Sequence, residues 1–127
     1  MGSFVTIDVP FAEVMRRKLL EIVPWCNIEA VTEMFRGVDA DRLLAGAPTF
    51  VLDCIDDVNT KADLIAYCVK NNMKILTSMG AGGKSDPTRL RIAPISECIN
   101  DPLAAKIKVR DTLRHFETDT HAFLFSA

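Results

Sequence analysis

Apolar residues recur at helical spacing near the start of the chain and predict an amphipathic helix over residues 10–22. Pro10 suits the first turn, where its missing N–H would have had no intrahelical partner. Asp8 is placed to cap this helix, and Pro24 marks its end. The apolar positions are Phe11, Val14, Met15, Leu19 and Ile22.

A second helix is predicted over residues 59–70, where apolar side chains again recur on one face. Thr60 or Asn59 is placed to cap its start. Asn71 and Asn72 follow the last periodic position and would end it.

Short apolar runs between the helices predict β-strands. Residues 50–55 form a continuous apolar run interrupted only by Asp53, which is typical of a strand buried on both faces. Residues 74–78 form a second such run, and residues 27–31 alternate apolar and polar positions as a half-buried strand does. A brief helix is predicted over residues 39–44, before the run at 50–55.

The order of these elements predicts the fold class. Strands and helices alternate with short links, which is the pattern of an α/β protein with a parallel sheet. The 127 residues suffice for one domain with a hydrophobic core. The apolar share of 49% and the charged share of 25% are those of a folded protein, and no apolar run approaches a membrane span.

The stretch SMGAGGKS at residues 78–85 differs by one residue from the phosphate-binding pattern G-x-x-x-x-G-K-[ST], because Ser78 stands in place of the first glycine. A true P-loop leads into a helix whose N-terminus binds phosphate. Here Pro87 follows, and the alternation around Ile92, which we expect to point inward, predicts a strand. The stretch is therefore not a P-loop.

The glycines of this loop, Gly80, Gly82 and Gly83, are compatible with two roles. They permit positive φ angles and the close approach of a ligand or another backbone. They equally suit a wide hairpin turn that binds nothing. Both interpretations stay open on these residues alone.

The stretch DCIDD at residues 53–57 places Asp56 and Asp57 just past a predicted parallel strand, where open α/β sheets bind their ligands. Carboxylates there suit Mg²⁺, which takes oxygen ligands and bridges nucleotide phosphates. Alternatively, Asp56 or Asp57 caps the helix that follows. The two interpretations are evenly matched on these residues.

The charge and the cysteine content exclude few classes of function. The net charge is −2, and basic side chains outnumber acidic ones in residues 84–114, which suits either a polyanion or a solvated helix face. The four cysteines lack C-x-x-C spacing, which disfavours a zinc site, and we expect Cys54 and Cys68 to pack as small apolar side chains. The opening MGSFVT fits a cloning remnant or a myristoylation pattern.

The chain resembles a known family over roughly residues 9–115. The segment VLDCIDDVNTKADLIAYCVKNNMKILTSMGAGGKSDPTRLRI is similar to the ThiF/MoeB superfamily of ATP-dependent carboxylate-activating enzymes, relatives of ubiquitin-activating enzyme. GAGGKSDPT and NDPLAAKIKVR resemble its tRNA threonylcarbamoyladenosine dehydratase branch. The resemblance implies a partial Rossmann-like open sheet, mainly parallel, with antiparallel strands after residue 87. It also implies one partial adenylating domain over residues 1–127, with 1–8 as a tag or disordered segment and 116–127 as a tail.

The resemblance implies a reaction as well. ATP adenylates the side-chain carboxylate of threonylcarbamoyladenosine in tRNA, and the activated carboxyl then cyclises with net loss of water. Mg²⁺ neutralises the phosphate charge, and AMP becomes a better leaving group than hydroxide. By motif position, Asp56 is the catalytic carboxylate that binds Mg²⁺–ATP. Asp57 and Lys61 fall near the nucleotide, and the loop residues on the substrate side are Gly80, Gly82, Lys84 and Asp86.

In the superfamily, a glycine-rich ATP loop precedes the part that this chain resembles, and a phosphate-contacting lysine falls where this chain has Phe11. The family also continues beyond HAFLFSA. We therefore expect a homodimer, or a complementary N-terminal half or partner chain that covers the sheet edge. The expected compartment is the cytoplasm, with a mitochondrial surface as the alternative.

Three functions stay open at this point. The first is ATP-dependent dehydration of tRNA threonylcarbamoyladenosine, with this chain as the C-terminal portion of the enzyme. The second is a non-catalytic fragment that binds a partner through the sheet edge or a basic helix at residues 106–114. The third is an activating enzyme for a ubiquitin-like or sulfur-carrier protein, which GAGGKSDPT disfavours.

Overall fold

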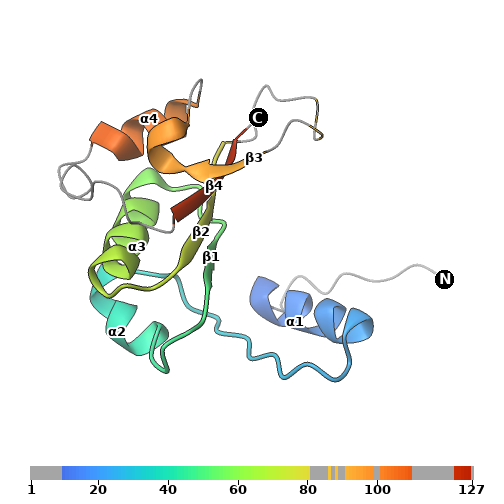
Figure 1. Cartoon of the computed structure of the whole chain (residues 1–127). Helices are drawn as coiled ribbons and strands as arrows, with labels where there is room; N and C mark the ends of the chain where they lie inside the picture. The colour runs from blue at the N-terminus through green and yellow to red at the C-terminus, as the bar shows by residue number, and fades with distance from the viewer. Residues whose placement is uncertain are drawn as a thin grey trace. The chain divides into compact units, whose positions relative to one another are not determined.

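The structure is a computed structural model that describes residues 10–80, 86, 88, 91–98, 101–109 and 122–126 (Figure 1). The chain forms two compact units, Met1–Met34 and Phe35–Ala127. Within the described residues, no helix has both the length and the apolar character to span a bilayer.

The first unit contains the predicted amphipathic helix α1 (Phe11–Ile22). It begins at Pro10, whose carbonyl accepts the N–H groups of Glu13 at 3.0 Å and Val14 at 3.2 Å, whereas the predicted cap Asp8 lies outside the described residues. None of its residues is fully buried. The strand predicted over residues 27–31 is wrong, because this segment pairs with no described strand.

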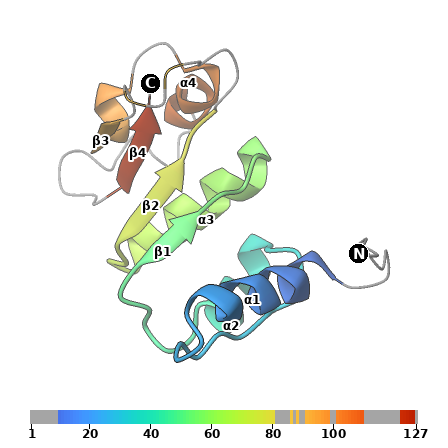
Figure 2. The same ribbon diagram turned by 90° about the vertical axis from the view of Figure 1, so that its right-hand side faces the viewer.

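The second unit is built on a four-stranded sheet in the order β1-β2-β4-β3 (Figure 2). β1 (Val51–Asp53) pairs in parallel with β2 (Ile75–Ser78), and β2 pairs in parallel with β4 (Ala122–Ser126). β3 (Arg91–Pro94) is antiparallel to β4. The predicted α/β fold, mainly parallel with an antiparallel strand after residue 87, is confirmed. The tail expected at residues 116–127 contains β4, whose run AFLFS joins β2 to β3.

The helices of this unit lie on one side of the sheet (Figure 1). They are the 3-10 turn η1 (Gly37–Asp39), α2 (Ala40–Leu43), α3 (Val58–Lys70), the 3-10 turn η3 (Ile95–Glu97) and α4 (Pro102–Val109). The two helices predicted at 39–44 and 59–70 are confirmed as α2 and α3. The Tyr67 hydroxyl of α3 donates to Asp41 Oδ1 of α2 at 2.8 Å and ties these two helices together.

The hydrophobic core lies between the sheet and these helices. Alternate residues of the central strands point into it, since successive side chains of a strand face opposite sides. The contribution of α3 is the apolar face that its helical periodicity predicts. The buried core residues are Val51, Leu64, Ile65, Cys68, Ile75, Met79, Cys98, Ala104 and Ile107.

The other face of the sheet is open in the described part of the chain, so the strand predicted to be buried on both faces is not. Leu52 of β1 is 70% exposed, and Ile92 of β3, expected to point inward, is 57% exposed. The strand register aligns Leu52 with Leu76, and Ile92 with Phe125. Leu52 and Ile92 thus present apolar side chains on the face that no described helix of this unit covers.

This asymmetry predicts different costs for truncating two apolar residues on neighbouring strands. Ile75→Ala, at a fully buried position, should lower the free energy of unfolding by about 2–5 kcal/mol because it leaves a cavity. Leu52→Ala should change it by no more than about 0.5 kcal/mol. Urea denaturation of both variants measures this. Equal losses would mean that something covers the open face in solution.

Candidate functional site

A buried cluster of polar side chains lies where β1 and β2 end. Lys61 Nζ donates to Asp53 Oδ2 at 2.6 Å, to Thr77 Oγ1 at 3.1 Å and to the carbonyl oxygen of Ser78 at 2.9 Å. The Thr77 hydroxyl also donates to Asp53 Oδ2. Lys61 and Thr77 are 0% exposed and Asp53 is 1% exposed. These four residues are called the Lys61 cluster below.

The positions of these residues follow from the local structure. The register pairs Asp53 with Thr77, so both side chains point to the helix-covered face. Lys61 is the fourth residue of α3 and approaches the same point from above the sheet. The three ammonium protons of Lys61 therefore meet three oxygen acceptors, which is the full capacity of the group.

Assembling such a cluster costs desolvation free energy, and removing one of its charged partners destabilises the fold further. Burying a carboxylate and an ammonium removes both from water, and only good geometry with further hydrogen bonds offsets that loss. Here each buried side-chain polar atom in the described residues has a hydrogen-bond partner. The cluster is thus a rigid joint between two strands and one helix.

The chain leaving β1, residues 54–57, is called the carboxylate loop here. Asp53 Oδ1 accepts the N–H of Ile55 at 2.9 Å, which turns the backbone away from the strand. Cys54, expected to pack in the core, is exposed because it lies past the last paired residue of β1. Asp56 is exposed as well. Its carboxylate therefore faces solvent at the carboxyl end of the sheet.

Asp57 has the second of the two roles considered for this stretch. Its Oδ2 accepts the backbone N–H and the hydroxyl of Thr60, both at 2.8 Å, and Asp57 is the N-cap of α3. The caps predicted at Thr60 or Asn59 are therefore replaced by Asp57. A carboxylate at this position also complements the positive end of the helix dipole.

The chain leaving β2 is described through Met79 and Gly80. A Cβ added to Gly80 would lie 3.7 Å from Asp101 Oδ1, which is an ordinary contact distance. Gly80 does not use the positive φ angle expected for this loop, since Gly46 is the only described glycine with one. The structure thus brings the start of the GAGGKSDPT motif against the DPLAAK motif. Gly82 and Lys84 lie outside the described residues.

Asp86 is exposed and bound locally. The Thr88 hydroxyl donates to Asp86 Oδ1 at 2.6 Å and the Thr88 N–H donates to it at 3.0 Å. These two bonds, the hydroxyl first, lower the pKa of the Asp86 carboxyl. Asp86 is therefore an anion that stabilises its own turn.

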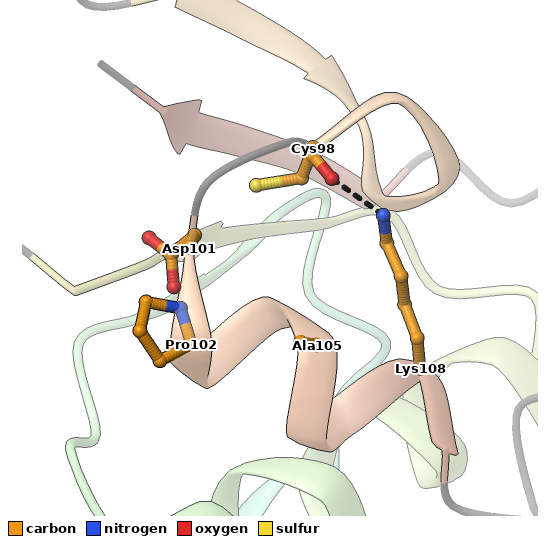
Figure 3. Close-up of a pocket in the computed structure, with 5 residues that line it drawn as sticks. All are labelled: Cys98, Asp101, Pro102, Ala105 and Lys108. Atoms are coloured by element: carbon orange, nitrogen blue, oxygen red, sulfur yellow. Dashed lines mark hydrogen bonds between the residues drawn. The ribbon is translucent and has the colours of Figure 1, made fainter.

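A cavity of about 470 Å³ lies beside α4 (Figure 3). It is lined by Cys98, Asp101, Pro102, Ala105 and Lys108. Asp101 Oδ1 accepts the N–H groups of Leu103 and Ala104, and Lys108 Nζ donates to the carbonyl of Cys98 at 2.6 Å. The helix N-terminus and the lysine thus already have partners within the chain.

The residues near the carboxylate loop fit Mg²⁺ in one respect. Mg²⁺ in nucleotide sites commonly takes one or two carboxylates and completes its shell with phosphates and water, and Asp56 offers an exposed carboxylate. Within the described residues, no group of three or more acidic, histidine or cysteine side chains is placed to hold a metal by itself. Any such site therefore needs the oxygens of a ligand.

Sequence reasoning singled out Lys61 but missed its partners. Asp53 was visible as the one charge inside an apolar run, and Thr77 as a polar residue inside the next strand. That pair of signals, one per strand, indicates a buried polar pair once the strands are aligned.

The fold and the site together indicate a class of protein: an open, mainly parallel α/β sheet with an exposed carboxylate at the carboxyl end of a strand. Residues 4–121 match the ThiF family. The chain belongs to the ThiF family, and the resemblance that the sequence suggested is confirmed.

Three similar curated proteins are tRNA threonylcarbamoyladenosine dehydratases. The Haemophilus influenzae protein is 40% identical over 103 residues, which are 81% of this chain and 40% of that protein. The Escherichia coli protein is 37% identical over 99 residues, 78% of this chain and 37% of that protein. Dehydratase 2 of Saccharomyces cerevisiae is 38% identical over 104 residues, 80% of this chain and 23% of that protein.

Solved structures agree. The Escherichia coli dehydratase in complex with ATP has a TM-score of 0.79 and 30% identity, covering 91% of this chain and 51% of that chain. The same protein in complex with AMP has a TM-score of 0.80 and 31% identity, covering 91% and 50%. This chain thus spans about half of the solved chains, and less of the curated relatives named above.

The capping role of Asp57 predicts a difference between two adjacent carboxylates. Asp57→Ala should lower the free energy of unfolding by about 1 kcal/mol, because the first turn of α3 loses its acceptor. Asp56→Ala, its matched control, should change stability by less than about 0.5 kcal/mol. Thermal denaturation of both variants measures this, and a larger loss for Asp56→Ala would contradict the assignment of the cap.

Cysteine labelling tests the burial around the Lys61 cluster. Burial, and then the charge of Asp53, raise the pKa of the Cys68 thiol to about 11, so at pH 8 it stays protonated and unreactive. Iodoacetamide followed by mass spectrometry should therefore label the exposed Cys26 and Cys54 first, and Cys68 and Cys98 only after denaturation. Labelling of native Cys68 as fast as Cys54 would contradict this packing.

Proposed function

We propose that this chain takes part in ATP-dependent dehydration of tRNA threonylcarbamoyladenosine, as the portion of the enzyme that contributes the loops following β1 and β2. The observation that carries the proposal is the exposed Asp56 carboxylate at the carboxyl end of a parallel strand, in a chain whose relatives have that activity. Ligands of open α/β sheets bind at this edge. Solved relatives in complex with ATP and AMP support nucleotide binding.

In this proposal Asp56 is the carboxylate on the nucleotide side. Bound Mg²⁺ would supply neutralisation of phosphate charge there. Asp57 holds the start of α3 through Thr60 and so fixes the backbone that presents Asp56. Gly80, Gly82, Lys84 and Asp86 belong to the loop on the substrate side.

The proposed reaction has two steps. A carboxylate oxygen of the modified nucleoside attacks the α-phosphorus of ATP, and pyrophosphate leaves. The carbamoyl group then bonds to the activated carboxyl carbon and loses a proton, while AMP departs with the former carboxyl oxygen. The net change in the nucleoside is the loss of water. The role of this chain is to orient the two reacting groups, which lowers the barrier by removing their freedom to diffuse.

A second candidate is a partner-binding role, including a homodimer. The observation that favours it is the open face of the sheet, where Phe50, Leu52 and Ile92 are each more than half exposed. Apolar surface of this kind is commonly covered by another chain. The third function considered, activation of a ubiquitin-like or sulfur-carrier protein, has no such observation in its favour.

Titration with Mg²⁺–ATP tests the first proposal. The parent chain should bind saturably, and Asp56→Asn, which keeps the shape but removes the charge, should weaken binding by about tenfold or more. Glu97→Gln, at an exposed carboxylate of η3, is the matched control and should bind like the parent. Isothermal titration calorimetry gives all three affinities.

Two results would count against the proposal. Equal affinities for the parent and Asp56→Asn would remove Asp56 from the nucleotide site. Failure of the parent to bind would mean that this chain does not hold ATP by itself, and sedimentation analysis for self-association would then test the second candidate.

A further inference from the structure

We propose that Lys61 is a positioning residue that couples the two loops leaving β1 and β2. A ligand held by the carboxylate loop then also orders Met79 and Gly80, where the glycine loop (the chain that follows β2) begins. The ligand arm of this proposal rests on the proposed function. The coupling itself rests on the Lys61 cluster.

A continuous series of hydrogen bonds links the two loops. It begins at the N–H of Ile55, which donates to Asp53 Oδ1 at 2.9 Å. It continues from Asp53 Oδ2 to Lys61 Nζ at 2.6 Å and ends at the carbonyl of Ser78 at 2.9 Å. The first residue of the series belongs to the carboxylate loop and the last residue is where β2 ends.

Lys61 has no capacity left for a ligand in this arrangement. Its side chain is fully buried and its three protons are donated to Asp53, Thr77 and Ser78. It therefore acts on a bound nucleotide through the residues that it holds. This is a different role from the direct contact near the nucleotide that the motif position implied.

Stability alone does not account for a buried ion pair at this place. Replacement of such pairs by apolar residues of similar volume is often neutral or stabilising, whereas an apolar pair would leave both loop starts untethered. What the charged pair adds is geometry: two acceptors on different strands held at fixed distances from one ammonium.

The strand ends held by Lys61 lead directly into the two loops of the proposed site. On one side Ile55 is followed by Asp56 and Asp57. On the other side Ser78 is followed by the buried Met79 and by Gly80, which lies against Asp101. A shift of Asp53 is therefore transmitted to the contact between the glycine loop and the start of α4.

Hydrogen exchange tests the coupling without any ligand. The main variant is the double replacement of Asp53→Leu and Lys61→Met, which removes both charges and should keep the fold. Amides of Met79 and Gly80 should exchange at least tenfold faster than in the parent, although neither residue is altered. Lys70→Met, at an exposed lysine at the end of α3, is the matched control and should leave both amides unchanged.

Coupling from β2 to the carboxylate loop is tested with a variant that keeps the Asp53–Ile55 hydrogen bond. Thr77→Val removes one partner each from Lys61 and Asp53 while keeping the side-chain shape, and it should speed exchange at Ile55 and Asp56. Exchange at the α2–α3 junction around Tyr67 should stay within threefold of the parent in every variant. Unchanged exchange at Met79 and Gly80 in the double variant would overturn the coupling, as would uniform acceleration throughout the unit.

A second readout distinguishes positioning from a merely structural role. In the parent, saturating Mg²⁺–ATP should slow exchange at the carboxylate loop and at Met79 and Gly80. In the double variant, protection at Met79 and Gly80 should be lost while its thermal midpoint stays near that of the parent. Protection of both loops in the double variant would overturn the proposal. If the parent binds no nucleotide, the proposed function fails, and the ligand-free exchange still decides the coupling.

Discussion

The geometry of the two loops that leave β1 and β2 depends on one buried ammonium group. Lys61 reaches from α3 to the ends of β1 and β2 and is bound there by a carboxylate, a hydroxyl and a carbonyl. A charge in this position can be accommodated only when every partner is present. The start of α3 and the direction of both exiting loops are therefore fixed together.

This constraint separates the residues that hold the site from those that would act in it. Asp53, Lys61 and Thr77 are inaccessible to ligands and determine where the loops begin. Asp56 is exposed and lies one residue beyond the tethered Ile55. A rigid support below and an exposed carboxylate above is the arrangement expected of a binding edge in an open α/β sheet.

The elements that depend on local sequence were predictable. Helices α1 and α3 follow from apolar periodicity, and the alternative in which Asp57 caps α3 is confirmed. Features that depend on distant parts of the chain were not. The segment at residues 27–31 alternates like a strand, yet it has no described strand to pair with, and Leu52 is apolar without a layer to cover it. The role of Lys61 required the register of two strands, which its own position in a helix does not reveal.

The family could be inferred from motifs, because GAGGKSDPT and DPLAAK are specific in composition, and the structure adds that Gly80 of the first lies against Asp101 of the second. The exposure of one face of the sheet, in contrast, could not be predicted from the sequence. The apolar residues on both faces of β1 predicted a cover on each side, and the described helices of this unit cover only one of them.

The most direct test of this account is a nitrogen-15 NMR spectrum of the lysine ammonium groups in the parent chain. A fully buried ammonium with three acceptors exchanges its protons slowly, so the account predicts an observable cross-peak that disappears in Lys61→Met and persists in Lys70→Met. If no slowly exchanging ammonium signal is seen in the folded parent chain, Lys61 is not held as described, and the joint between β1, β2 and α3 is incorrect.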